Sequence, residues 1–175
     1  MSSQLSLPED PRLAQVAEEL AKTRGASMLS DKECTLVWVS DELAALIGCT
    51  DPVELGVGKH LVEAWLTGPW GSTISLESQL EQLFEAWPRW IEDTPGGKAG
   101  LLEIVRRGIK NCHPMSQWWT APESVSDEAV ETILDQIAQL EPEPLPPVWA
   151  TSFDYLQGDL PATRINEVVS RLHDA

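Results

Sequence analysis

TLVWVSDELAALIG (Thr35–Gly48) contains, in direct succession, the signals for a β-strand, a helix start and a helix stop. Its first five residues are β-branched, aromatic or aliphatic, which favours a half-buried strand. Ser40 and Asp41 follow, and each has a side-chain oxygen that can accept a hydrogen bond from the first turn of a helix. Gly48 suits the left-handed residue that ends many helices. The stretch therefore predicts a strand running directly into a short helix, whose apolar residues recur at helical spacing: Leu43, Leu46 and Ile47.

The residues before this stretch predict a helix and the first strand of a hairpin. Apolar residues recur at helical spacing from Pro11 to Thr23, and proline suits the first turn of a helix. Residues 26–29 then form a short apolar run, which predicts a strand that pairs with residues 34–39 across a turn. Residues 1–10 are mostly small and polar with a proline, and we expect them to form a flexible N-terminus.

The region of about residues 76–140 is rich in helical patterns. One apolar face ends near Pro88, which we expect to end or kink its helix because proline lacks a backbone donor. Further helices are predicted over residues 60–66, around residues 102–110 and over residues 126–140. Residues 94–97, TPGG, predict a loop.

The C-terminal part of the sequence predicts one more strand and one more helix. Residues 148–153 are rich in apolar and β-forming side chains, and four prolines in residues 142–147 predict a stiff linker before them. Residues 161–175 predict a helix that begins at Pro161. We expect its apolar seam to serve as an interface for dimerisation or signal output, formed by Ile165, Val168, Val169 and Leu172.

A helix, a hairpin and a strand that runs into a short helix ending at glycine are similar to the start of a PAS sensor domain. The resemblance rests mainly on residues 25–50. Residues 158–161, GDLP, with the predicted helix after them also resemble the lead into the catalytic domain of bacterial adenylate and guanylate cyclases. The resemblance implies a sensory or regulatory domain that binds a small organic ligand and controls an attached or associated output, such as a nucleotide cyclase.

Pattern and resemblance together predict a helix-rich, PAS-like α+β fold, with a small antiparallel sheet packed against at least five helices. The expected domains are a flexible N-terminus (1–10), a PAS-like regulatory domain (11–160) with a helical insertion (about 76–140), and a C-terminal signalling or dimerisation helix (161–175).

Composition excludes several classes of partner. The chain has 28 acidic and 12 basic residues and a formal net charge of −16, which repels nucleic-acid phosphates and anionic membranes. Apolar runs are shorter than a membrane span, and the N-terminus lacks a secretory signal pattern. The three cysteines, Cys34, Cys49 and Cys112, are widely spaced and odd in number, which favours a reducing cytoplasm over a disulfide framework.

Eight tryptophans stand against two phenylalanines and one tyrosine. Indoles are large and carry a donor that needs a partner, so they favour cores with polar inclusions, ligand pockets and interfaces. Packing in a plain core is the alternative to a pocket. We expect a ligand-binding core lined by Trp38, Trp65, Trp87 and Trp149, with His60 and Arg89 as polar contacts.

The sequence carries no recognisable catalytic or metal-binding motif, and we predict that the chain is not an enzyme. Cys112 and His113 are adjacent, but adjacency does not place two side chains in a catalytic dyad. His60 is a candidate haem ligand, yet no two histidines or cysteines share a ligand spacing, so the cofactor stays unassigned. Two alternatives to the sensor remain: a non-catalytic protein–protein interaction module and a small Cys/His enzyme. A homodimer and a C-terminal output domain both stay open as partners.

Overall fold

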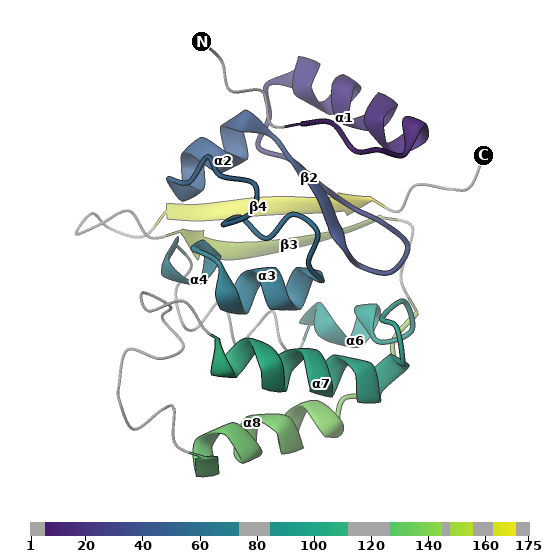
Figure 1. The fold of residues 1–175 in the computed structure, drawn as a ribbon, viewed down its shortest axis with the longest axis vertical. Helices are drawn as coiled ribbons and strands as arrows, with labels where there is room; N and C mark the ends of the chain where they lie inside the picture. Colours follow the sequence, from purple (N-terminus) through teal and green to yellow (C-terminus); the bar gives the residue numbers. More distant parts are fainter. Residues whose placement is uncertain (1–5, 74–84, 112–126, 145–147, 156–162, 171–175) are drawn as a thin grey trace.

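The computed structural model describes residues 6–73, 85–111, 127–144, 148–155 and 163–170 (Figure 1). The fold is α+β, as predicted, with more than five helices and two small antiparallel sheets among the described residues. No helix in these ranges is both long and apolar enough to cross a membrane. The elements are, in chain order, α1 (Pro11–Thr23), β1 (Met28–Ser30), β2 (Leu36–Val39), α2 (Asp41–Ile47), α3 (Leu61–Thr67), α4 (Trp70–Thr73), α6 (Trp87–Trp90), α7 (Gly97–Lys110), α8 (Asp127–Ala138), β3 (Val148–Tyr155) and β4 (Thr163–Ser170).

The strand-to-helix transition forms as the sequence predicts. β2 leads into α2, and the Ser40 hydroxyl caps the helix by accepting a hydrogen bond from the Leu43 N–H at 3.2 Å. The same hydroxyl accepts from the Ser27 N–H at 2.9 Å, so it also ties α2 to the start of β1. Gly48 ends α2 with a φ of 80°, in the left-handed region that glycine enters without strain.

The predicted hairpin is confirmed with shifted boundaries. β1 and β2 pair antiparallel, with Met28 opposite Val39 and Leu29 opposite Trp38. Both strands begin two residues later than predicted, and β2 does so because the Asp31 carboxylate accepts from the N–H groups of Glu33 and Thr35, which extends the turn to residue 35. α1, whose predicted bounds are confirmed, packs on this hairpin at the upper end of the molecule (Figure 1).

The backbone of residues 58–61 runs beside β2 on the edge away from β1. The Gly58 N–H donates to the Leu36 carbonyl at 2.8 Å, and the Leu36 N–H donates to the Lys59 carbonyl at 2.8 Å. The Leu61 N–H then donates to the Cys34 carbonyl at 2.8 Å. This pairing fixes the first residue of α3 against the hairpin and places His60 at the junction.

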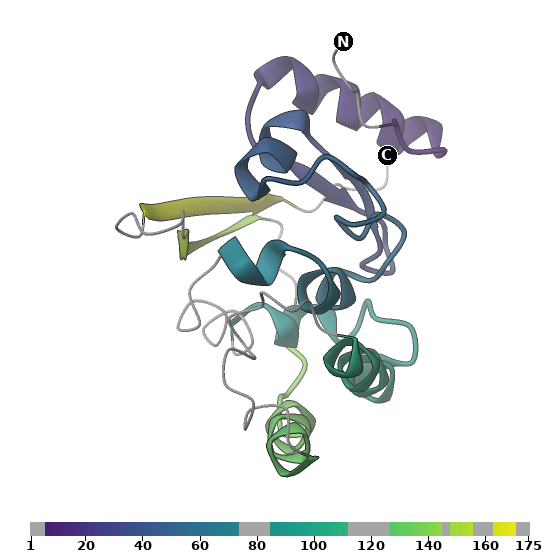
Figure 2. The same cartoon turned by 60° about the vertical axis from the view of Figure 1, so that its left-hand side comes forward.

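The helical half lies on the other side of α3. In both views α3, α7 and α8 follow one another away from the hairpin (Figures 1 and 2). The approach of α7 to α3 is close at Gly108, where an added Cβ would lie 2.7 Å from Leu66 Cδ1. A large apolar cluster fills this half, with Val62, Leu66, Trp87, Leu101, Val105, Ile109, Leu134 and Ile137 among its buried members.

The helices predicted at residues 60–66, 102–110 and 126–140 are confirmed as α3, α7 and α8, but α7 begins well before residue 102. His60 precedes α3 as its cap, and Gly97, predicted as loop, is the first residue of α7. Pro88 lies in the first turn of α6, where its missing N–H costs no hydrogen bond. The predicted helical residues 76–84 and the predicted connector after residue 111 lie outside the described residues.

The predicted C-terminal helix is wrong. The predicted strand over residues 148–153 is confirmed as β3, and Thr163–Ser170 forms β4 antiparallel to it, with Phe153 opposite Ile165 and Trp149 opposite Val169. Successive residues of a strand lie on opposite faces, so the odd spacing of Ile165 and Val168 removes the expected helical seam. The β-branched residues of this segment favour a strand once β3 offers a pairing partner. Leu172, the fourth residue of the predicted interface, lies outside the described residues.

Candidate functional site

A buried histidine at the start of α3 makes hydrogen bonds to two different parts of the interior. The side chain of His60 is the N-cap of α3: its Nδ1 accepts a hydrogen bond from the Val62 N–H at 3.2 Å. Its Nε2 lies 3.0 Å from Oγ1 of Thr94, in the turn between α6 and α7. His60 is 8% exposed and Thr94 3%, so this contact is shielded from water.

The hydrogen bonds define the protonation of this group. Because Nδ1 of His60 accepts from the backbone of Val62, the ring proton belongs on Nε2. Nε2–H then donates to the Thr94 hydroxyl, which in turn donates to the Trp90 carbonyl at 2.7 Å. The result is a directional chain, His60 to Thr94 to Trp90, in which each buried polar atom has a partner. We call these three residues the His60 chain.

The surroundings keep His60 neutral. Burial lowers its pKa from 6.5 to about 4, because a charged imidazolium loses its hydration in the interior. The carboxylates of Glu63 and Asp31 oppose this shift, and the Arg107 guanidinium adds to it. With both ring nitrogens engaged, His60 cannot ligate haem without breaking its cap or its bond to Thr94. The arrangement therefore does not fit the haem ligand considered from the sequence.

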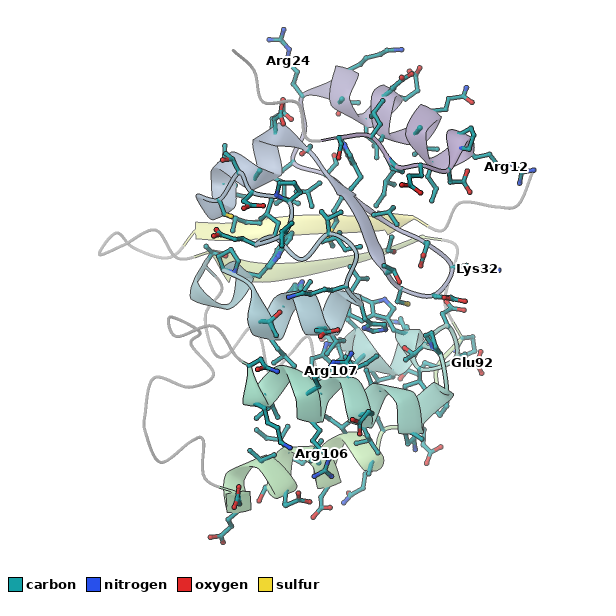
Figure 3. All side chains as sticks on the ribbon, in the orientation of Figure 1. Arg12, Arg24, Lys32, Glu92, Arg106 and Arg107 are labelled. Atoms are coloured by element: carbon teal, nitrogen blue, oxygen red, sulfur yellow. The ribbon has the colours of Figure 1, made fainter. Side chains whose placement is uncertain are left out.

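A charged rim adjoins the His60 chain at the surface. Arg107 on α7 forms a two-pronged pair with Glu63 on α3, with Nε to Oε1 at 3.1 Å and Nη2 to Oε2 at 2.9 Å. The hydrogen bonds from Arg107 lower the pKa of the Glu63 carboxyl. Lys59, which precedes α3, donates from its Nζ to the hydroxyl of Thr67, the last residue of α3, at 3.2 Å. The rim thus joins the two helices beside the buried histidine, with Arg107 on the α3 side of α7 (Figure 3).

The tryptophans predicted to line one pocket are distributed over three apolar clusters. Trp38 is buried under α1, Trp87 is buried in the cluster around α7, and Trp65 packs half-buried against the cluster of the hairpin and α2. The structure therefore does not gather these three indoles around one point. The side chain of Trp149 lies outside the described residues. Trp90, which sequence reasoning left out of the pocket, packs against both larger clusters.

Arg89 contacts Glu85 and Glu143, which are not part of the His60 chain. Its Nη1 donates to the Glu85 carbonyl at 2.9 Å, and its Nε lies 3.8 Å from a Glu143 carboxylate oxygen. The Glu143 N–H also donates to the Pro88 carbonyl at 3.0 Å. These contacts anchor the segment after α8 to α6, which is a structural role different from the predicted ligand contact.

Thr94 and Trp90 were missed by sequence reasoning. Thr94 lies in the TPGG stretch, where proline and glycine indicate a turn and mask the hydroxyl that the turn buries. Trp90 contributes its backbone carbonyl, which no sequence pattern can single out. The signal that could have identified Thr94 is its place as a polar residue in a turn directly after a tryptophan-rich helix.

Other chemistry is limited among the described residues. They include no group of three or more histidine, cysteine or acidic side chains that could hold a metal ion. Cys34 is buried and Cys49 half-buried, both as thiols, and burial raises the pKa of Cys49, which disfavours the reactive thiolate. Cys112 and His113, the candidates for the enzyme alternative, lie outside the described residues.

Comparison with protein-family models, with curated proteins and with solved structures found no match for this chain. The functional reading therefore depends on the site itself.

Proposed function

We propose that this chain is a non-catalytic regulatory domain that binds a small organic ligand beside α3 and controls an attached or associated signalling output, such as a nucleotide cyclase. The observation that carries the proposal is the His60 chain, a buried hydrogen-bonded link at the junction of two apolar clusters. Buried polar groups cost free energy unless they are partnered, so a ligand that offers or removes a hydrogen-bond partner would change their arrangement.

α3 contributes residues to both apolar clusters. A ligand that moves α3 would therefore change the packing of both halves of the fold. Leu61 and Ala64 pack toward the hairpin and α2. Val62 and Leu66 pack toward α7 and α8. Trp90 packs against both clusters, so an aromatic surface already bridges them. A ligand inserted beside α3 would separate or tighten these halves.

The chemistry of the junction favours a neutral aromatic ligand. Indole faces stack on planar rings, and the His60 chain offers one hydroxyl whose second lone pair can accept from a ligand N–H or O–H. The formal net charge of −16 disfavours multiply charged anions. Ligand binding transmits a signal only if the ligand has different affinities for two arrangements of α3 and the α6–α7 turn.

The order of the first elements supports the sensory reading, since α1, the β1–β2 hairpin and α2 follow one another as in the resemblance to PAS domains. A cytoplasmic location and action through an output domain or a homodimer belong to the same proposal. The output and the partner copy are not tied to a C-terminal helix, because residues 163–170 form a strand.

The test is a titration of the full chain with a set of neutral aromatic compounds, followed by intrinsic tryptophan fluorescence and thermal unfolding. We expect at least one compound to give a saturable fluorescence change and a raised Tm. Thr94→Val should weaken the binding of that compound, because the variant removes the hydroxyl of the His60 chain.

Thr132→Val is the matched control. The Thr132 hydroxyl also donates to the carbonyl four residues earlier, that of Glu128, but it lies exposed on α8. A compound set without a saturable response, or equal loss of binding in both valine variants, would count against the ligand site.

The second candidate is a non-catalytic protein–protein interaction module, which the strongly acidic composition favours. A co-purifying basic protein, released by salt, together with no response to the compound set would favour this module over the sensor.

A further inference from the structure

α7 is the cationic element of an acidic chain. It carries four basic residues, Lys98, Arg106, Arg107 and Lys110, and one acidic residue, Glu103. α8 carries no basic residue and has acidic residues at Asp127, Glu128, Glu131 and Asp135. The two helices are therefore electrostatically complementary.

The contacts between α7 and α8 show that the two helices pack antiparallel. Lys98 Nζ, near the start of α7, donates to the Ala138 carbonyl at the end of α8 at 3.1 Å. Arg106, further along α7, pairs with Glu131 of α8, with Nη1 to Oε1 at 3.1 Å. In the views of Figures 1 and 3 the two helices lie side by side, with Arg106 on the α8 side of α7. A basic side chain of α7 thus lies at each end of the α7–α8 interface.

The centre of the α7–α8 interface is apolar. Leu101 and Val105 of α7 are buried, and Leu134 and Ile137 of α8 are 4% and 0% exposed. The other side of α8 is polar and exposed, which is the pattern of an amphipathic helix lying on a surface. The face of α8 that packs in this cluster thus has two apolar residues three positions apart, Leu134 and Ile137, and an acidic residue before them, Glu131, which pairs with Arg106.

The attachment of α8 is one-sided. Among the described elements its main packing partner is α7, and both of its polar links to α7 are solvent-exposed. Exposed ion pairs contribute little and are screened by salt. Beyond α8, the Glu143 N–H donates to the Pro88 carbonyl at 3.0 Å, so the segment after α8 is held to α6 rather than to α7.

We propose that the α8-facing side of α7, defined by Lys98, Leu101, Val105 and Arg106, is a docking surface for an acidic amphipathic helix of a partner protein. α8 occupies this surface in cis and competes with the partner. The surface lies on the opposite side of α7 from the Glu63 pair, and the proposal does not depend on the ligand site.

The experiment measures binding in trans to the full chain. The probe is a fluorescent peptide with the sequence of residues 127–140, titrated against the wild-type chain and against Glu131→Lys by fluorescence anisotropy. Glu131→Lys removes the pair with Arg106 and places like charges together, so α8 should compete less well. We expect the peptide to bind this variant about fivefold more tightly than wild type at low salt, and high salt should weaken binding to both.

Glu128→Lys is the matched control, since it makes the same charge change on the same helix outside the pair with Arg106. It should leave the peptide affinity close to that of wild type. Equal affinities of Glu131→Lys and Glu128→Lys, or no binding to either, would overturn the proposal. So would equal binding by a peptide in which Glu131 and Asp135 are both replaced by lysine.

Amide hydrogen exchange of the wild-type chain gives an independent measurement that requires no variant. α8 should exchange faster than α7, because it opens without the rest of the cluster. Exchange of α7 and α8 at one common rate would show that α8 does not lift separately and would also overturn the proposal.

Discussion

His60 and Thr94 are 34 positions apart in the sequence, and their side chains meet at 3.0 Å in the interior. The contact joins the N-terminus of α3 to the turn that starts α7. Because residues 58–61 also pair with β2, this buried hydrogen bond is one of the contacts that link the hairpin half of the molecule to its helical half. The predictions below test this link and the contacts around it.

Thr94→Val removes the acceptor of the His60 N–H while nearly keeping the side-chain volume. The buried donor is then left without a partner, which should lower the free energy of unfolding by about 1–3 kcal/mol. Urea unfolding monitored by tryptophan fluorescence measures this loss. Thr132→Val, whose hydroxyl is exposed, should cost about 0.5 kcal/mol or less. Equal losses in the two variants would contradict a special role for the buried bond.

Acid should destabilise the fold through His60. Its pKa is about 4 in the folded chain against 6.5 for the free side chain, so between these values the unfolded chain binds a proton that the folded chain excludes. The contribution of His60 to stability is therefore complete above pH 6.5 and falls as the pH drops toward 4. The slope should approach about 1.4 kcal/mol per pH unit at most.

His60→Asn is the matching control for this pH dependence, because asparagine keeps a side-chain acceptor at the helix cap and does not titrate. Its free energy of unfolding, measured by urea at each pH from 7 to 4.5, should vary less than that of wild type. An unchanged slope would assign the acid sensitivity to other groups.

Glu63→Gln removes the negative charge from the ion pair with Arg107. The Glu63 side chain is 17% exposed and that of Arg107 is 50% exposed, so solvent screens the pair partly. A double-mutant cycle with Arg107→Met should give a coupling of about 0.5–1 kcal/mol that decreases with salt. Because the pKa of Glu63 is lowered in the folded chain, this contribution is present at neutral pH and lost as the pH falls below the ordinary range of a glutamate.

A comparison pair is available for the same cycle. Lys22 and Glu19 form an exposed pair one turn apart on α1, and their coupling should be smaller than that of Glu63 with Arg107. A larger coupling on α1 would contradict the view that the α3–α7 pair gains from its two-pronged geometry.

Gly108→Ala should destabilise the contact between α3 and α7. The new Cβ would lie 2.7 Å from Leu66 Cδ1 and 3.1 Å from Leu66 Cβ. Overpacking of this kind costs about 1–3 kcal/mol and outweighs the gain of about 1 kcal/mol from replacing glycine within a helix. Thermal unfolding should therefore show a lowered Tm. In a Leu66→Ala background the same substitution should be neutral or stabilising, and a further loss there would contradict the steric explanation.

Local signals predicted the first third of the fold. Ser40 and Gly48 bound α2 as their side-chain chemistry indicates, since a hydroxyl cap and a left-handed glycine act within one turn of the chain. Pro11 likewise begins α1. These signals require no distant partner, so they can be recognised from the sequence alone.

The site was predicted less well because its partners come from distant positions. His60 was identified as a polar candidate, but its hydrogen bond to Thr94 depends on how the α6–α7 turn packs against α3. The indoles of Trp38, Trp65 and Trp87 were grouped by residue type, and the structure separates them because each belongs to a different packing surface.

By itself the sequence determined the α+β class, the capped helices of the N-terminal part and the strongly acidic charge. Tertiary structure alone decided that residues 163–170 are a strand, because β-branched residues at this spacing suit either state until β3 supplies a pairing partner. It also decided the neutral state of His60, since only packing removes the imidazole from water. Local chemistry specifies where elements begin and end, whereas burial and pairing across the chain specify what they become and what they can bind.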